Sequence, residues 1–203
     1  MRSNNFDDVA FIYDFLAQLI FGKSLRKAQI CFLRNIPNDA IVLVLGSGTG
    51  WIAEEILKEK PGSKITLLDA SQKMTGRARK RLSNKPVDIF CADESKVFPI
   101  PFDVVILPFF LDLFPDKKMN SVMENIKKNS KPESVWLVTD FVSDKRWQRV
   151  YLWIMYRFFS CTCNIEADKL PDWKTILTSN DLLIREKKRF YKGFIQSAVC
   201  IQK

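Results

Sequence analysis

Histidine is absent from this chain of 203 residues. Its absence excludes a Ser-His-Asp triad, a Cys-His dyad, a histidine-ligated metal and any imidazole acid or base. Five cysteines are present, but none forms a CxxC pair. Cys161 and Cys163 lack a second pair to complete a metal site, so we expect no metal. The odd cysteine count in a chain of this length predicts a reduced, cytoplasmic protein.

The chain also lacks a long apolar run. Its most apolar late stretch is 147–159 (WQRVYLWIMYRFF), which contains two arginines and is shorter than the roughly 20 apolar residues that span a bilayer. The first residues are polar and acidic rather than basic and then apolar, so we expect no secretory signal. With 47% hydrophobic and 27% charged residues, the composition excludes a disordered or low-complexity chain.

Charge is unbalanced toward the basic side. The 32 Lys and Arg outnumber the 23 Asp and Glu, giving a formal net charge of +9, which permits an anionic partner without specifying one. Four basic residues share one predicted helix face: Lys73, Arg77, Lys80 and Arg81. Because charge runs on helices are usually solvated faces, we interpret this face as the outside of a sheet-flanking helix. Nucleic acid is therefore not the expected partner.

Apolar runs alternate with helical patterns over the first two-thirds of the chain. Strands are expected at 40–45, 64–68, 87–92, 102–107 and 134–142. Helical spacing is expected at 7–21, 24–34, 51–60, 72–82 and 116–128. The alternation predicts a doubly wound α/β sheet. The run AIVLVL at 40–45 is typical of a central strand that is covered on both faces.

The last third of the chain has a different pattern. Pro171-Asp172 is expected to open a helix with the proline in its first turn, and Asn180 is expected to end it in the left-handed conformation. Strands at 182–190 and 194–201 are separated only by Lys192-Gly193, so they must be antiparallel. We find no repeat, linker or second domain.

A glycine-rich turn, Gly46-Ser-Gly-Thr-Gly50, lies between the first strand and the following helix. Glycine lets the backbone turn tightly and lets a ligand approach closely, and the next helix directs its free N–H groups into the crevice. Asp69 ends the second strand, where a carboxylate can accept from both hydroxyls of a ribose. Strand, turn, helix and acid together predict a nucleoside-binding site.

The glycine spacing argues against a dinucleotide. That fingerprint, G-x-G-x-x-G, requires a third glycine at position 51, where this chain has Trp51. A large indole there would obstruct a pyrophosphate, so we expect a ligand without phosphate and disfavour a nicotinamide oxidoreductase.

Five stretches carry a family resemblance: IVLVLGSGTG (41–50), ITLLDASQKM (65–74), CADESKVFP (91–99), FDVVILPFFLDLFPD (102–116) and KPESVWLVTDF (131–141). Together they are similar to the motifs of the class I S-adenosylmethionine-dependent methyltransferases. FDDVAFIYD (6–14) resembles the lid helix of the ubiquinone/menaquinone-type branch. The resemblance implies one domain over 1–203, with a helical lid at 1–36 and a substrate-side helical segment at 143–180. It also implies a Rossmann-like, seven-stranded, mostly parallel sheet with an antiparallel C-terminal strand and helices on both faces.

The resemblance also implies S-adenosylmethionine as cofactor and a set of binding residues. Gly46, Ser47 and Gly48 would pass under its methionine part, and Asp69 would hold the ribose. Ala70 and Met74 would flank the adenine, Asp93 would accept from its amine, Leu107 would line the floor through its backbone, and Tyr13 would close the pocket.

Two positions depart from the family pattern. Val44 stands where the family usually has an acid two residues before the first glycine, which helps to bind the amino group of the cofactor. After the fourth strand, Leu107-Pro108-Phe109-Phe110 replaces the polar residue and Pro-Pro-aromatic stretch that hold an exocyclic amine. This second departure disfavours methylation of amino groups in nucleic acid.

The expected function is in-line methyl transfer to carbon or oxygen of a small hydrophobic or aromatic acceptor. Asp112, Asp140 and Tyr151 are candidate weak bases, and the sequence singles out none of them. The aromatic stretch 147–159 would line the acceptor pocket, or would simply pack as a buried helix at the sheet edge. The alternative function is a catalytically weak, methyltransferase-like binding module or scaffold with an anionic or nucleic-acid partner. The acceptor and the oligomeric state do not follow from the sequence.

Overall fold

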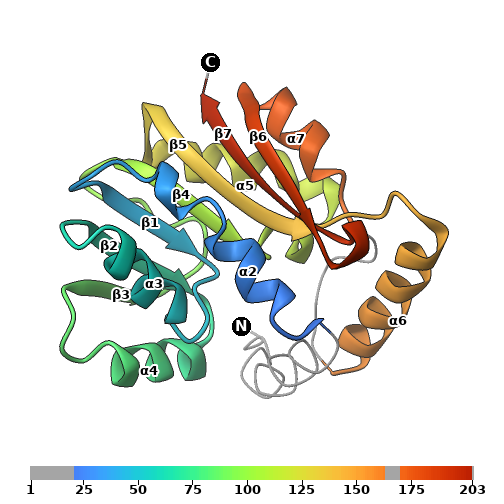
Figure 1. Ribbon diagram of the computed structural model, residues 1–203, viewed down its shortest axis with the longest axis horizontal. Helices are drawn as coiled ribbons and strands as arrows, with labels where there is room; N and C mark the ends of the chain where they lie inside the picture. Colours follow the sequence, from blue (N-terminus) through green and yellow to red (C-terminus); the bar gives the residue numbers. More distant parts are fainter. Residues whose placement is uncertain (1–20, 163–169, 203) are drawn as a thin grey trace.

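The computed structural model describes residues 21–162 and 170–202. Its centre is a seven-stranded sheet of order β3-β2-β1-β4-β5-β7-β6 (Figure 1). The first five strands in chain order pair in parallel, and β7 is antiparallel to both β5 and β6. The predicted doubly wound sheet with an antiparallel C-terminal strand is thus confirmed.

The strands lie close to the predicted ranges. They are β1 (Ile41–Leu45), β2 (Lys64–Asp69), β3 (Val87–Cys91), β4 (Phe102–Pro108), β5 (Ser130–Phe141), β6 (Leu182–Phe190) and β7 (Ile195–Gln202). The four residues from Val42 to Leu45 are at most 2% exposed. Such an unbroken apolar run is stable only where helices cover both faces of the strand.

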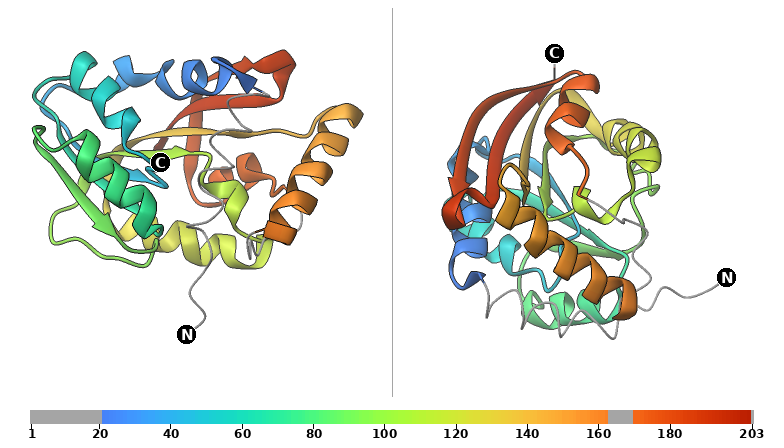
Figure 2. Two further views of the ribbon diagram at one scale, coloured as in Figure 1. Left: turned by 90° about the horizontal axis from the view of Figure 1, so that it is seen from below. Right: turned by 90° about the vertical axis from the view of Figure 1, so that its right-hand side faces the viewer.

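Helices cover both faces of the sheet (Figure 2). Side chains alternate along β1, so Val42 and Val44 pack on one side with α3 (Trp51–Glu59), and with the short helix η1 (Leu33–Asn35) that follows α2 (Ser24–Ile30). Leu43 and Leu45 pack on the other side with α5 (Asp116–Lys128) and α7 (Trp173–Ser179). Besides α6, which is described below, the remaining described helices are α4 (Gln72–Arg81), η2 (Leu111–Leu113) and η3 (Tyr191–Gly193).

Helix α6 (Arg146–Thr162) follows the end of β5 and stands at the side of the sheet (Figures 1 and 2). Its Leu152 is buried in a small third cluster with Phe21, Phe141 and Phe194. Trp173 of α7 links that helix to the end of β5, because its indole Nε1–H donates to the Phe141 carbonyl over 2.7 Å.

Two predicted boundaries in the last third of the chain are wrong. Asp172 is the cap of α7, accepting from the backbone N–H of Thr175 over 3.4 Å, so the helix begins one residue later and Pro171 lies outside it. Asn180 is not left-handed, with φ of −101°; the left-handed residue is Asp181, with φ of 60°. Asn and Asp both tolerate this conformation, so the sequence did not distinguish the two positions.

Strand β5 also begins four residues before its predicted start, at Ser130 rather than Ser134. Ser130 pairs with Phe102, and the register then shifts, so that Val104 pairs with Val135. Pro132, which lies between the two paired stretches, has no N–H to donate to a strand ladder.

Candidate functional site

The glycine turn is tied to the carboxyl end of β2. The backbone N–H groups of Gly46 and Ser47 both donate to the Leu68 carbonyl, over 2.9 and 3.2 Å. All three glycines of the turn have positive φ, between 54° and 75°. The turn therefore has the left-handed backbone that only glycine adopts without strain.

Gly48 and Gly50 serve different purposes in this turn. A Cβ at Gly50 would lie 2.9 Å from a methyl of Leu82 and 3.0 Å from Ala78, so glycine here allows α3 to approach α4. A Cβ at Gly48 would meet nothing within 4 Å. The space above Gly48 is therefore open, as close approach of a ligand requires.

Ser47 holds a polar atom that the fold leaves unpaired. The residue is 4% exposed, and its Oγ has no hydrogen-bond partner. A buried hydroxyl without a partner costs free energy, and such groups are expected where a ligand completes the hydrogen bonding.

Asp69 bridges the turn and the start of the next helix. Its Oδ2 accepts from the Gly48 N–H over 2.8 Å, and its Oδ1 accepts from the Ser71 N–H over 2.9 Å. The Asp69 carbonyl also accepts from the Ala92 N–H over 3.2 Å, at the end of β3. The structure thus brings together the turn, the acid of β2 and the loop that leads to Asp93.

The other residues predicted to bind the cofactor differ in exposure and in their contacts. Asp93 is exposed, and its Oδ1 accepts from the Ser95 N–H within the same loop. Met74 is 8% exposed on α4, and the Ala70 carbonyl accepts from the Cys91 thiol. Leu107 is fully buried among the side chains of the α5 face, which leaves only its backbone for a ligand. Tyr13 lies outside the described residues.

The side chains of Val44 and Trp51, which differ from the family or dinucleotide patterns near the turn, both pack against neighbouring side chains. Val44 is fully buried in the cluster on the α3 face. Trp51 packs against the same cluster, and the guanidinium of Arg26 lies 5.2 Å from the centre of its ring. Both side chains therefore contribute to the packing on the α3 face of the sheet.

A pair of carboxyl groups lies at the ends of β4 and β5. Asp140 is fully buried, and its Oδ2 accepts from the N–H groups of Leu111 and Asp112 over 3.1 and 3.3 Å. The segment that carries Asp112 borders the glycine turn, because a Cβ on Gly46 would lie 2.9 Å from the Phe110 ring. Phe110, two residues before Asp112, therefore contacts the glycine turn.

Burial changes the titration of this pair. Desolvation raises the pKa of Asp112 to about 7. Desolvation, and then repulsion from Asp112, raise the pKa of Asp140 well above its usual value, against three backbone N–H donors that favour its charged form. Carboxyl groups with pKa values near neutrality can exchange protons at physiological pH. Asp112 and Asp140 are thus brought together, whereas Tyr151 lies on α6 with its ring facing Trp147.

The sequence did not predict a row of polar side chains beside Asp140. Asp140 pairs with Gln196 of β7, which pairs with Arg189 of β6. Side chains of directly paired residues point to one face, so this row runs from the buried acid toward solvent. Nothing in the sequence revealed it, because it exists only through the β5–β7–β6 register.

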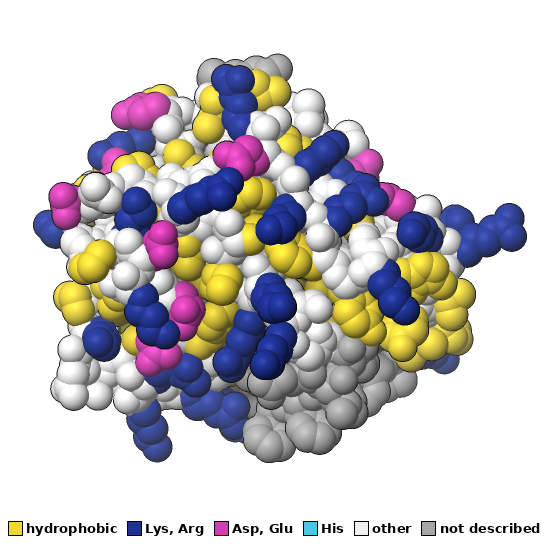
Figure 3. Space-filling model, in the orientation of Figure 1, with side chains coloured by type: hydrophobic (Ala, Val, Ile, Leu, Met, Phe, Trp, Pro, Cys, Tyr) yellow, Lys and Arg dark blue, Asp and Glu magenta, His cyan; other side chains and the backbone are white. Residues whose placement is uncertain are grey.

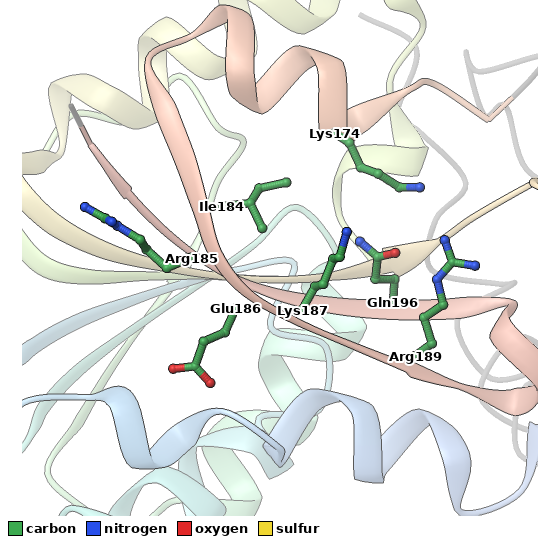
Figure 4. Close-up of a pocket in the computed structure, with 7 residues that line it drawn as sticks. All are labelled: Lys174, Ile184, Arg185, Glu186, Lys187, Arg189 and Gln196. Atoms are coloured by element: carbon green, nitrogen blue, oxygen red, sulfur yellow. The ribbon is translucent and has the colours of Figure 1, made fainter.

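The outer end of that row borders a basic hollow of about 220 Å³ (Figure 4). Lys174, Lys187, Arg189 and Gln196 lie on one side of β6, while Glu186 points away toward α2. The Nε2 of Gln196 is buried without an acceptor. Lys174 and Arg189 both form ion pairs with Asp144, which stands near them.

Two searches of the described ranges, 21–162 and 170–202, gave no result. No helix there is both long and apolar enough to cross a membrane. No group of three or more Cys, Asp or Glu side chains gathers there in a way that could hold a metal ion. Cys163 lies outside these ranges.

The sheet defines a Rossmann-like domain with its glycine turn at the carboxyl end of β1. Residues 42–133 match a protein family described as a methyltransferase domain. This stretch, a little under half of the chain, is therefore similar to a methyltransferase domain, as its motifs predicted.

Curated relatives agree with this family. A demethylmenaquinone methyltransferase from Thermotoga maritima is 31% identical over 115 residues, covering 56% of this chain and 50% of that protein. A malonyl-[acyl-carrier protein] O-methyltransferase from Ilyobacter polytropus is 34% identical over 84 residues, covering 41% of this chain and 31% of that protein. The match thus spans half or less of the length of these two relatives.

Solved structures share the fold over almost the whole chain. Magnesium protoporphyrin IX methyltransferase from Synechocystis has a TM-score of 0.71 at 15% identity, covering 98% of this chain and 96% of that one. An S-adenosylmethionine-dependent methyltransferase from Aquifex aeolicus has a TM-score of 0.65 at 15% identity, covering 97% of each chain. At this identity the likeness establishes the fold alone.

Proposed function

We propose that this protein binds S-adenosylmethionine and transfers its methyl group to a small, apolar or aromatic acceptor at carbon or oxygen. One observation carries the proposal. The Asp69 carboxylate, fixed between the Gly48 and Ser71 N–H groups, faces an open glycine turn at the carboxyl ends of β1 and β2. This is the place where a nucleoside binds in a doubly wound sheet.

The residues present fit this cofactor. Asp69 would accept from the ribose hydroxyls, and Asp93, beyond the end of the neighbouring strand, would accept from the adenine amine. The unpaired Oγ of Ser47 supplies a polar contact beneath the methionine part. Because Val44 is packed in the core, we assign part of the role of the family's missing acid to Ser47.

S-adenosylmethionine, when bound, supplies an electrophilic methyl group on its sulfonium. The chain must then hold the acceptor in line, exclude water and remove a proton. Asp112 is the proton acceptor that we propose, because it lies two residues after Phe110, whose ring contacts the glycine turn, and burial brings its pKa to about 7. Asp140 positions it by accepting from its backbone N–H.

The acceptor side is supported by aromatic packing at the ends of β4, β5 and β7. The rings of Phe109, Phe141 and Phe194 form consecutive contacts with centroids 4.9 and 5.1 Å apart. Phe141 and Phe194 are buried, whereas Phe109 is half-buried and supplies the part of this cluster that an apolar or aromatic acceptor could contact. The relative named for demethylmenaquinone favours a quinol-like compound.

Calorimetric titration with S-adenosylmethionine and S-adenosylhomocysteine, with NAD as the control ligand, tests the cofactor. We expect micromolar binding of the first two ligands and none of NAD. Asp69→Ala should weaken binding by about 1–3 kcal/mol, which is roughly 5- to 150-fold. Asp69→Asn keeps one acceptor oxygen and controls for loss of the turn, and Asp88→Ala is a matched exposed control. Unchanged affinity in a folded Asp69→Ala protein would remove the ribose assignment.

One observation favours a second candidate, a methyltransferase-like binding module with an anionic partner. The hollow of Figure 4 gathers two lysines and two arginines. If no adenosyl ligand binds, a gel-shift series in salt distinguishes the candidates, because phosphate contacts weaken steeply as salt rises.

A further inference from the structure

Helix α6 exposes an unusual amount of apolar surface. Val150, Tyr151, Trp153 and Ile154 are 57, 40, 67 and 53% exposed. Large apolar side chains that gather on a surface, rather than being scattered singly, mark an interaction site. Figure 3 shows this group as a continuous hydrophobic patch at the side of the molecule. We call these four side chains the α6 patch.

The patch lies on one face of the helix. Val150 and Ile154 are four positions apart and lie at its centre, with Tyr151 and Trp153 on its two sides, so the patch spans roughly half of the circumference of the helix at about 100° per residue. Gln148 and Leu152, at 0 and 4% exposure, hold the opposite side of α6 against the protein. The patch is therefore an outward face of a docked helix, and its exposure does not come from an unpacked end.

Positive charge accompanies the patch. Arg146 and Arg149 are exposed along the same helix, and α6 contains no acidic residue. Lys and Arg side chains appear among and beside the patch in Figure 3. Tryptophan, tyrosine and arginine together are the side chains that suit the boundary between lipid headgroups and acyl chains.

We propose that the α6 patch docks the protein on the surface of an anionic phospholipid bilayer. The helix would lie in the plane of the interface, with its apolar side chains among the upper acyl chains and its arginines on the headgroup phosphates. The net charge of +9 gives a favourable long-range attraction to the same surface. A neutral protein partner would satisfy the apolar side chains but not these charges.

Docking would also serve the proposed chemistry, and this second step rests on the proposed function. Helix α6 follows directly from β5 and packs through Leu152 on the Phe141 and Phe194 cluster. A bilayer bound to α6 would therefore lie next to the aromatic acceptor side. An apolar acceptor could then enter from lipid without crossing water.

Vesicle sedimentation of the full chain tests the docking step. The vesicles contain phosphatidylcholine alone, or phosphatidylcholine with phosphatidylglycerol in roughly equal parts. We expect binding to the anionic vesicles only, weakening as salt rises, with a blue shift of tryptophan fluorescence that Trp153→Phe removes. The double variant Trp153→Ser, Ile154→Ser should lower the partition coefficient at least tenfold. Its matched control is Val97→Ser, Ile100→Ser, which changes two apolar side chains at 61 and 59% exposure in the loop after β3.

A second pair of variants tests the charge. Arg149→Gln should weaken vesicle binding severalfold at low salt. Lys85→Gln, which removes an exposed positive charge outside α6, should not. The proposal would be overturned if each control variant lost as much vesicle binding as the α6 variant it is paired with, or if the wild type did not bind anionic vesicles. So would a concentration-dependent dimer in sedimentation velocity that the Trp153/Ile154 variant abolishes, if the wild type ignores vesicles.

The two proposals can fail separately. The Trp153/Ile154 variant leaves the glycine turn untouched, so it should bind S-adenosylmethionine in solution with wild-type affinity. Loss of vesicle binding with intact cofactor binding assigns the defect to α6. Vesicle binding without cofactor binding would keep the docking surface and remove the proposed methyl transfer.

Discussion

Replacing Asp112 by asparagine should make the protein more stable above neutral pH. The substitution keeps the size of the side chain and the backbone N–H that donates to Asp140. It removes a carboxyl group whose ionisation the folded protein resists. A site that costs stability in this way is what proton transfer near neutral pH requires.

The magnitude and sign follow from the pKa. Burial raises the pKa of Asp112 from 3.8 to about 7, so between these values the folded chain keeps a proton that the unfolded chain has lost. The free energy of unfolding therefore falls as pH rises through this window. Three pH units at about 1.4 kcal/mol each give roughly 4 kcal/mol. Because Asp112 is only half-buried, we expect Asp112→Asn to add about 2–4 kcal/mol near pH 8 and little near pH 4.

Urea unfolding of both proteins at a series of pH values measures this difference. Asp103→Asn is the control with the opposite sign. Partial burial raises the pKa of Asp103, but hydrogen bonds from Lys131 Nζ and the Ile41 N–H outweigh it and leave the pKa below its usual value. Asp103 therefore stabilises the fold above about pH 4, and its loss should cost stability at neutral pH. Parallel pH curves for wild type and Asp112→Asn would refute the titration of Asp112 near neutrality.

Three further changes test the turn and the packing around it. Gly50→Ala should destabilise the fold by about 1–3 kcal/mol, because the new Cβ overlaps neighbouring side chains and φ is positive. Gly48→Ala should cost about 1 kcal/mol, because φ is positive there but no neighbouring atom is in the way. Thermal unfolding compares the two variants, and equal losses of stability would contradict the role of Gly50 in packing. Ser47→Ala should leave the unliganded protein as stable or slightly more so, yet weaken S-adenosylmethionine binding severalfold in calorimetry; a large loss of stability would mean that its Oγ is satisfied within the fold. Trp173→Phe removes the 2.7 Å hydrogen bond to the Phe141 carbonyl and should cost about 1–3 kcal/mol in urea unfolding, and an unchanged midpoint would contradict that bond.

The sequence predicted the fold because local signals agreed with each other. An apolar run, a glycine turn and a helical pattern recur in the order of a doubly wound sheet, and the C-terminal turn is too short for anything but an antiparallel pair. Of the boundaries that failed, Asn180 and Asp181 are neighbours that satisfy the same rule, and the start of β5 at Ser130 depends on its pairing with Phe102. Packing with distant strands decides between them.

The site was less accessible to sequence reasoning. Gly48 and Asp69 could be paired in advance because the carboxyl ends of adjacent parallel strands share one edge. The pairing of Asp112 with Asp140 could not, since both were only candidates near strand ends and their contact depends on how η2 folds back. The exposed face of α6 also differs from the interpretation of this aromatic stretch as a buried helix. Helical periodicity identifies which residues share a face, but it does not indicate whether another element covers that face.

The position of β7 sets the order in which this sheet can be completed. It follows every other strand in the chain and yet pairs on both sides, with β5 and β6. During synthesis, the edge of β5 must therefore stay unpaired until residues 195–202 have emerged, and unpaired edges invite association between chains. Gln196, which stands beside Asp140, arrives with the same strand. The chain thus completes its glycine turn early, whereas the strand that covers the edge of β5 beside Asp140 is added last.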